Sequence, residues 1–134
     1  MVAAVAEASP RTILVVDDEP SIREVLVTYL EHAWAPRGYA VESVDSGKAA
    51  LAAAQRRRPA LVLLDIEMPG MDGVTALKSL RALDPGIPVI VLTANESARV
   101  AGEALKAGAF SYMPKPVKFR YLDHLVASVL RPPA

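Results

Sequence analysis

The sequence lacks cysteine altogether. Disulfides and thiolate-ligated metal sites are therefore excluded, and the absence fits a reducing compartment, so we expect a cytoplasmic protein. Long hydrophobic runs are also missing, since none reaches the ~18 residues that a membrane-spanning helix needs. Charge of one sign is not in excess, because 15 basic residues balance 15 acidic ones. We therefore expect neither a membrane nor a nucleic acid as a partner.

The 134 residues suit one domain, which at this size needs no disulfide or metal for stability. The first ten residues, "MVAAVAEASP", have no basic segment, and Glu7 interrupts them. They are predicted to form a flexible leader (1–10) rather than a signal peptide. The prolines of "RPPA" cannot continue a helix, so 131–134 is a predicted tail. A single domain standing alone is expected over 11–130, because nothing resembles a linker to another module.

Short aliphatic runs alternate with longer segments of helical periodicity. The runs typical of strands are "TILVV" (12–16), "AVESV" (40–44), "ALVLL" (60–64), "PVIVLT" (88–93) and a weaker "AFSYM" (109–113). Helical spacing is found at 22–30, 49–54, 74–81, 96–107 and 117–130. Five strand–helix pairs predict an α/β fold, a parallel sheet with helices on both faces. The segment 31–40 is long for a connection between the first helix and the second strand.

The composition of the strands predicts their order in the sheet. Strands 1, 3 and 4 are continuous apolar runs, which indicates central strands buried on both faces. Strand 2 is mixed, and strand 5 contains Ser111 and is followed by Pro114, so these two are expected at the edges. The order 2-1-3-4-5 satisfies this assignment. In such a doubly wound sheet, ligands bind outside the carboxyl ends of the strands.

Acidic, hydroxyl and basic residues follow the strands at that edge. Asp17 and Asp18 follow strand 1, Asp65 follows strand 3, Thr93 ends strand 4, and Lys115 follows strand 5. Three close carboxylates repel one another by several kcal/mol, on the order of 4 kcal/mol per pair, unless they protonate or hold a cation. Oxygen ligands without His or Cys favour Mg²⁺ or Mn²⁺. A carboxylate beside a metal, a lysine and a hydroxyl is a plausible phosphate acceptor.

Each of these residues alone also has an ordinary structural explanation. An Asp after a strand is usually the N-cap of the next helix, and Asp17, Asp18 or Asp72 could each be one. A Lys-Pro pair is usually part of a solvated loop. It is the coincidence of reactive groups at four strand ends on one edge that favours a functional site.

Four motifs carry a resemblance to a known family. They are "VVDDE" (15–19), "LLDIEMPGMDG" (63–73), "VLTA" (91–94) and "YMPKP" (112–116). In order and approximate spacing they resemble the receiver domain of two-component response regulators, over roughly 11–130. The resemblance implies a flavodoxin-like (βα)5 fold, whose strand order the chemotaxis receiver shares.

The resemblance also implies roles for the acidic cluster. Asp65 would accept a phosphoryl group from a sensor histidine kinase or a histidine phosphotransfer protein. Asp17, Asp18 and Asp65 would hold Mg²⁺ (or Mn²⁺) together with the backbone carbonyl of Glu67, whose side chain is not expected to bind the metal. Lys115 would bind a phosphoryl oxygen. Apart from this self-catalysed transfer and the later hydrolysis of the aspartyl phosphate, no enzymatic activity is expected.

The switch residues follow from the same resemblance. Thr93 would bond a phosphoryl oxygen, Tyr112 would then turn inward, and small Ala94 would leave room for the group. Glu67 and Asn95 stand where the family tunes the lifetime of the phosphoryl group. The resulting change would reach a downstream protein through the face formed by the fourth helix, the fifth strand and the fifth helix.

The chain departs from the family pattern in several places. Val117 stands where the family often has an aromatic residue, and the connection at 31–38 is longer than usual. "FSYMP" (110–114) also lacks the common acidic pair, and Pro114 directly precedes Lys115. His32, Trp34 and Arg37 in that connection could contact a partner, or Trp34 could pack a longer loop onto the first helix. None of these departures touches the predicted phosphorylation pocket.

Two other classes of function are kept as alternatives. A degenerate receiver would act as a phosphorylation-independent binding module, although Asp65, Thr93 and Lys115 are all present. An aspartyl-phosphate phosphatase would carry Asp-x-Asp on the first strand, whereas here the reactive acid lies on the third. A nucleotide-binding protein is disfavoured because no glycine-rich loop follows strand 1.

Overall fold

The computed structural model describes residues 11–68, 73–94 and 98–130, and within these ranges strands and helices alternate as predicted. The predicted leader (1–10) and tail (131–134) lie outside the described residues. The elements are β1 (Arg11–Val16), α2 (Pro20–Trp34), the 3₁₀ turn η1 (Ala35–Arg37), β2 (Tyr39–Val44), α3 (Gly47–Arg56), β3 (Leu61–Asp65), α4 (Gly73–Leu83), β4 (Val89–Thr93), α5 (Ala98–Lys106), β5 (Ser111–Pro114) and α6 (Phe119–Val129).

The five strands form one parallel sheet in the order β2-β1-β3-β4-β5, which confirms the prediction. Every residue of β3 and β4 is buried, whereas the edge strands β2 and β5 are partly exposed. The apolar runs therefore place strands 1, 3 and 4 in the centre because both faces of each are covered.

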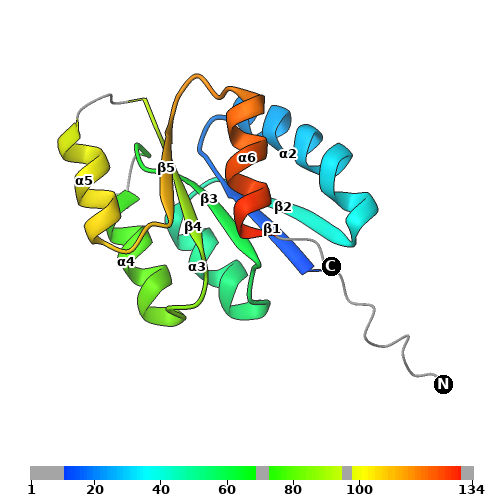
Figure 1. The fold of residues 1–134 in the computed structure, drawn as a ribbon. Helices are drawn as coiled ribbons and strands as arrows, with labels where there is room; N and C mark the ends of the chain where they lie inside the picture. Colours follow the sequence, from blue (N-terminus) through cyan, green and yellow to red (C-terminus); the bar gives the residue numbers. More distant parts are fainter. Residues whose placement is uncertain (1–10, 69–72, 95–97, 131–134) are drawn as a thin grey trace.

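Helices cover the two faces of the sheet unequally (Figure 1). α2 and α6 lie on one face, and α3, α4 and α5 lie on the other. Alternate residues of a strand point to opposite faces, so Ile13 and Val15 pack with α2 and α6, whereas Leu14 and Val16 pack with the other three helices. Each face thus has its own apolar core.

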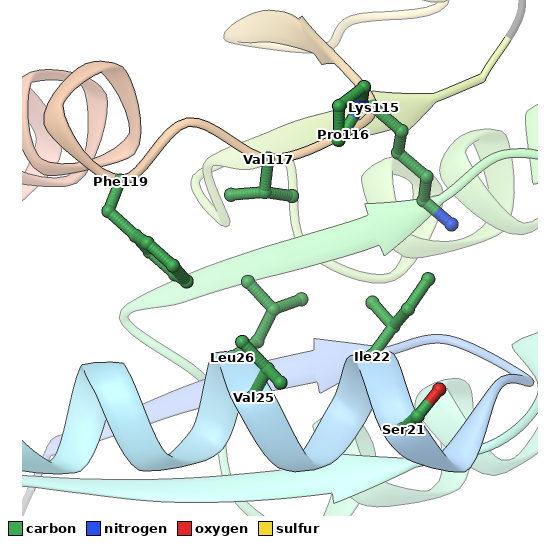
Figure 2. Close-up of a pocket in the computed structure, with 8 residues that line it drawn as sticks. All are labelled: Ser21, Ile22, Val25, Leu26, Lys115, Pro116, Val117 and Phe119. Atoms are coloured by element: carbon green, nitrogen blue, oxygen red, sulfur yellow. The ribbon is translucent and has the colours of Figure 1, made fainter.

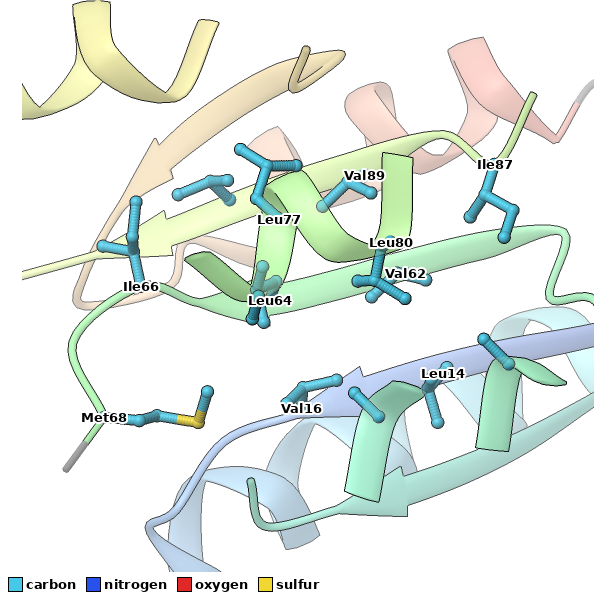
Figure 3. Packing of buried hydrophobic residues seen from close by; sticks show 14 of the residues in the cluster. Leu14, Val16, Val62, Leu64, Ile66, Met68, Leu77, Leu80, Ile87 and Val89 are labelled. Atoms are coloured by element: carbon cyan, nitrogen blue, oxygen red, sulfur yellow. The ribbon is translucent and has the colours of Figure 1, made fainter. Parts of the chain in front are cut away.

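The core under α3, α4 and α5 includes the first residues after β3 (Figure 3). Leu77 and Leu80 of α4 point onto the sheet, and Ile66 and Met68 extend the core beyond the end of β3. Gly73 begins α4 against the backbone of Ile66, and a Cβ there would clash with the carbonyl oxygen of that residue. A glycine is therefore required where the chain returns from the sheet edge to the helix.

The segment 31–40 differs from the long connection that the sequence predicts. α2 continues to Trp34, because Leu26, Leu30 and Trp34 recur every four residues on its buried face. η1 follows, and Gly38 makes the turn into β2 with a positive φ of 92°. No long loop is present between these two elements, so that prediction is wrong.

Trp34 itself is only 2% exposed. Its ring meets that of Tyr39 edge-on, with 5.5 Å between centroids. A direct contact between Trp34 and a partner is therefore excluded in this fold. His32 and Arg37 are exposed, and the Arg37 guanidinium lies over the Trp34 ring at 4.7 Å from its centroid.

In the described part of the chain, no helix has both the length and the apolar character needed to cross a membrane.

Candidate functional site

The carboxyl edge of the sheet gathers the residues that the sequence predicts there. Asp17, Asp65 and Thr93 are buried at the ends of β1, β3 and β4. Backbone hydrogen bonds continue the ladder past the strands: the Ile66 N–H donates to Leu92 O (2.9 Å), and the Lys115 N–H donates to Thr93 O (2.8 Å). The positions of the site residues are therefore determined by the pairing of the strands and not by the conformation of a long loop.

Lys115 joins the acids of two strands. Its Nζ lies 3.0 Å from Asp17 Oδ2 and 3.2 Å from Asp65 Oδ2. Asp18 completes the cluster, since Asp17, Asp18 and Asp65 each offer an oxygen, and the three oxygens lie within 4.8 Å of one another. Among the described residues, the Lys115 ammonium group therefore pairs with two of the three carboxylates of this cluster.

The second oxygen of each buried acid is held by the backbone. The Glu19 N–H donates to Asp17 Oδ1 (2.9 Å), and the Glu67 N–H donates to Asp65 Oδ1 (3.0 Å). Arg23 holds the same loop from the other side, because its Nη1 donates to the Asp17 carbonyl oxygen at 2.8 Å. These bonds orient each carboxylate so that its other oxygen faces Lys115.

The N-cap explanation does not apply to the acids after β1. Glu19, not Asp17 or Asp18, is the N-cap residue of α2, and its side chain makes no capping bond. Asp72 lies outside the described residues. The carboxylates of Asp17 and Asp18 are therefore available to the cluster.

The site raises the pKa of Asp65 from 3.8 to about 6. Burial is the main cause, and the charge of Asp17 adds to it, while the Glu67 N–H and Lys115 act in the opposite direction. The pKa of Lys115 is also raised: burial lowers it, but the hydrogen bond to Asp17 and the charge of Asp65 outweigh burial. Lys115 therefore stays an ammonium group, and Asp65 is the carboxyl group that titrates near neutrality.

The donor set fits a hard divalent cation. The cluster supplies only carboxylate oxygens, which Mg²⁺ and Mn²⁺ accept readily. The Lys115 ammonium and the Arg23 guanidinium on the Asp17 carbonyl supply two positive charges beside three carboxylates, so the ionised cluster keeps an excess of negative charge that a cation would neutralise.

Glu67 makes a contact that the sequence did not predict. Its Oε1 accepts a hydrogen bond from the backbone N–H of Ala94 at 2.6 Å. This bond joins the loop after β3 to the end of β4, so the side chain takes part in the site as well as the backbone. No spacing rule signals it, because the direction of a loop side chain depends on the tertiary fold. Asn95, the other predicted tuning residue, lies outside the described residues.

An apolar groove of about 300 Å³ lies beside Lys115 (Figure 2). Val117 and Phe119 point across it toward α2, whose Val25 is 52% exposed. Phe119 also stacks on Tyr29, with 4.6 Å between ring centroids. We call this surface the α2 groove, and its lining comprises Ser21, Ile22, Val25, Leu26, Lys115, Pro116, Val117 and Phe119.

A second surface lies on the other side of β5. Tyr112 of β5 faces outward and is 38% exposed, and Phe110 and Tyr121 are also exposed. Of these three residues, Tyr121 also lines a hollow, together with Met113, Pro114, Lys115, Pro116 and Lys118. We call the surface formed by α5, β5 and α6 the β5 face. Tyr112 is thus outward in this structure, on the side where the sequence predicts the signalling surface.

Comparisons with known proteins agree with this geometry. A family model described as "Response regulator receiver domain" matches residues 13–127. The Mycobacterium tuberculosis protein described as "Probable transcriptional regulatory protein TcrX" is 38% identical over 128 residues, 94% of this chain and 52% of that protein. "Transcriptional regulatory protein ZraR" of Escherichia coli O157:H7 is 44% identical over 117 residues, 87% of this chain and 25% of that protein. The chain spans about half or a quarter of the length of these relatives.

Solved structures with similar folds cover nearly the whole of the described chain. The chemotaxis protein CheY4 of Vibrio cholerae has a TM-score of 0.81 and 32% identity, over 90% of this chain and 99% of that one. A CheY-like response regulator receiver domain protein from Methanospirillum hungatei has the same TM-score and identity, over 90% of this chain and 93% of that one.

Proposed function

The chain belongs to the family of response regulator receiver domains of two-component systems, and on that premise we propose that Asp65 accepts a phosphoryl group from a phosphohistidine. The donor is a sensor histidine kinase or a histidine phosphotransfer protein. The observation that carries the proposal is the buried Asp65 carboxyl group, held between Lys115 and the Glu67 N–H. Burial raises the pKa of this carboxyl group to about 6, so most of it is the nucleophilic carboxylate at neutral pH.

The transfer step is a displacement at phosphorus. The Asp65 oxygen attacks the phosphorus atom, an O–P bond forms, and the P–N bond to the donor imidazole breaks with its electron pair left on nitrogen. Lys115 pairs with an oxygen of the phosphoryl group, as its ammonium already pairs with Asp65. Mg²⁺ bound by Asp17, Asp18, Asp65 and the Glu67 carbonyl would neutralise negative charge during the transfer.

Phosphorylation changes charge at one edge of the sheet. The phosphoryl group carries up to two negative charges in place of the one on the Asp65 carboxylate, so the edge gains about one negative charge and new acceptor oxygens. A shift from mostly inactive to mostly active protein needs about 5.5 kcal/mol of differential stabilisation. Bonds from the Thr93 hydroxyl and Lys115 to the phosphoryl oxygens supply part of this, and Tyr112 moves inward on the β5 face as they form. A downstream protein binds the altered β5 face.

Labelling by a small phosphodonor tests the function. Incubation with acetyl phosphate and Mg²⁺ should add one phosphoryl group, which mass spectrometry of peptides should place on Asp65. EDTA should prevent the addition, because the acidic cluster then keeps its excess negative charge and repels the donor. If the wild-type chain takes no label, or takes it elsewhere, the acceptor role is refuted and a phosphorylation-independent binding module is favoured.

The α2 groove supports docking of the donor protein. It is apolar and begins at Lys115, so a partner seated in it would hold its phosphohistidine near the Asp65 edge (Figure 2). We expect Val25→Glu to slow phosphotransfer from the donor protein at least about tenfold, since a charge would enter the contact. Labelling by acetyl phosphate should not change. Leu83→Glu, at an exposed apolar site on α4, is the matched control; equal slowing by both variants would contradict docking in this groove.

A further inference from the structure

The loop between β1 and α2 carries two acids of the cluster, and only one of them is held by its own side chain. The Asp17 carboxylate bonds the Glu19 N–H at 2.9 Å and Lys115 Nζ at 3.0 Å. Within the described part of the chain, the Asp18 carboxylate has no hydrogen-bond or ion-pair partner. Its oxygen still lies within 4.8 Å of an oxygen of Asp17 and of Asp65. The place of Asp18 in the cluster therefore depends on the backbone that flanks it.

Arg23 of α2 holds that backbone. Its Nη1 donates to the Asp17 carbonyl oxygen at 2.8 Å, and its main-chain N–H donates to the Glu19 carbonyl oxygen at 3.0 Å. The Asp17 carbonyl belongs to the planar peptide unit that continues into Asp18. A guanidinium group bonded to this carbonyl therefore orients the plane from which the Asp18 side chain departs. The bond is charge-assisted and its donor is rigid, so it holds the peptide more firmly than a neutral donor would.

We propose that Arg23 is a positioning residue of the metal site, which sets the affinity for Mg²⁺ by holding the Asp18 carboxylate in place. The inference rests on the metal-binding part of the proposed function. Arg23 acts through the peptide between Asp17 and Asp18, and it needs no contact with the cation or with the phosphoryl group. Loss of a residue that orients a metal ligand weakens metal binding by roughly 10- to 100-fold.

The charge of Arg23 and its positioning role predict opposite results when the side chain is removed. The guanidinium carries a positive charge beside the acidic cluster, so its loss alone would strengthen the attraction for a dication. Loss of the bond to the Asp17 carbonyl instead frees the Asp18 carboxylate to move. A ligand that must be ordered on binding lowers the affinity. The direction of the change in Mg²⁺ affinity decides between the two.

Calorimetric titration of the full chain with Mg²⁺, without any phosphodonor, tests the proposal. Arg23→Ala should bind Mg²⁺ about tenfold more weakly than wild type. Arg23→Lys keeps the charge but not the rigid fork of donors, and should lie between the two. Lys48→Ala is the matched control, because it removes an exposed positive charge from the first turn of α3 at the same edge. Its affinity should stay within about twofold of wild type.

A double-mutant cycle tests whether Arg23 acts through Asp18. Asp18→Asn alone should weaken Mg²⁺ binding, since it removes a carboxylate ligand. In the Asp18→Asn background, Arg23→Ala should change the affinity by no more than about twofold, because the group that it positions is already gone. An undiminished effect of Arg23→Ala in that background would overturn the assignment.

Labelling by acetyl phosphate gives a second readout. For Arg23→Ala, the Mg²⁺ concentration that gives half the maximal labelling rate should rise about tenfold, in line with the weaker binding. The rate at saturating Mg²⁺ should stay within about threefold of wild type, because Lys115 still pairs with Asp65. A merely structural role for Arg23 would lower the melting temperature and leave the Mg²⁺ affinity unchanged.

The outcomes separate this inference from the proposed function. If wild type binds Mg²⁺ and takes label, equal or tighter binding by Arg23→Ala overturns the inference alone. Should Arg23→Ala fail to fold, Arg23→Lys is judged by the same criterion. If wild type binds Mg²⁺ but takes no label, the acceptor role of Asp65 fails, and calorimetry still decides the role of Arg23. If wild type binds no Mg²⁺, the metal site and this inference fail together.

Discussion

Asp65→Asn is expected to abolish Mg²⁺-dependent labelling by acetyl phosphate. An amide oxygen is a far weaker nucleophile than a carboxylate, so no O–P bond forms at that position. The fold should be intact, because the Asn side chain has the same shape and its oxygen can still accept from the Glu67 N–H. The amide nitrogen replaces the oxygen that pairs with Lys115, which keeps its bond to Asp17. Intact-mass spectrometry after incubation with acetyl phosphate checks the result.

The control for this experiment is Asp45→Asn, the same chemical change at an exposed carboxylate. It should be labelled at the wild-type level. Persistent labelling of Asp65→Asn would refute the assignment of the acceptor, since another side chain would then carry the phosphoryl group. A binding module that ignores phosphorylation would show no label in any of the three proteins.

The same substitution is expected to stabilise the fold at pH 8 in the absence of metal. The pKa of Asp65 rises from 3.8 in an ordinary setting to about 6 in the folded protein, chiefly through burial. A rise of this size means that the ionised carboxylate destabilises the folded state by about 3 kcal/mol. Asn carries no charge at any pH, so the free energy of unfolding of Asp65→Asn should exceed that of wild type by up to about 3 kcal/mol.

The gain should depend on pH in a defined direction. Above about pH 6 the carboxylate is ionised in both folded and unfolded wild-type protein, and the full difference is present. As the pH falls from about 6 to about 4, the folded protein binds a proton that the unfolded chain does not, so wild type recovers the difference. Urea unfolding of both proteins in EDTA, from pH 4 to pH 8, measures it. A difference that does not change with pH, or a less stable variant at pH 8, would contradict burial as the cause.

Saturating Mg²⁺ should reduce this difference. A cation held by the acidic cluster binds the folded wild-type protein and not the unfolded chain, so it raises the free energy of unfolding of wild type. Asp65→Asn offers one carboxylate fewer and should gain less. The destabilisation of the metal-free site is thus tied to the groups that would bind the metal and accept the phosphoryl group.

The positions of the site residues could be predicted from sequence because they depend on the sheet. The apolar runs of β1, β3 and β4 require burial on both faces, which determines the strand order and places Asp17, Asp65 and Thr93 at one edge. Lys115 lies at the same edge because it directly follows β5, the strand that pairs with β4. The spacing of apolar residues along the sequence is enough to predict which segments form strands or helices and which of their residues are buried.

The contacts around these residues could not be predicted in the same way. The Arg23 bond to the Asp17 carbonyl and the Glu67 bond to Ala94 both depend on the direction of a side chain in or beside a loop. The end of α2 was missed for a different reason. Pro36 and Gly38 suggested a loop, but the buried face of α2 continues to Trp34, and packing outweighed those local signals.

Lys115 and Pro116 line both the α2 groove and the hollow of the β5 face. On the proposed function, a donor in the α2 groove and a target in the hollow of the β5 face would overlap at these two residues, so they could not occupy the chain together. The donor would then have to transfer its group and leave before the target binds. An excess of unphosphorylated donor would compete with the target for these residues and lower the output.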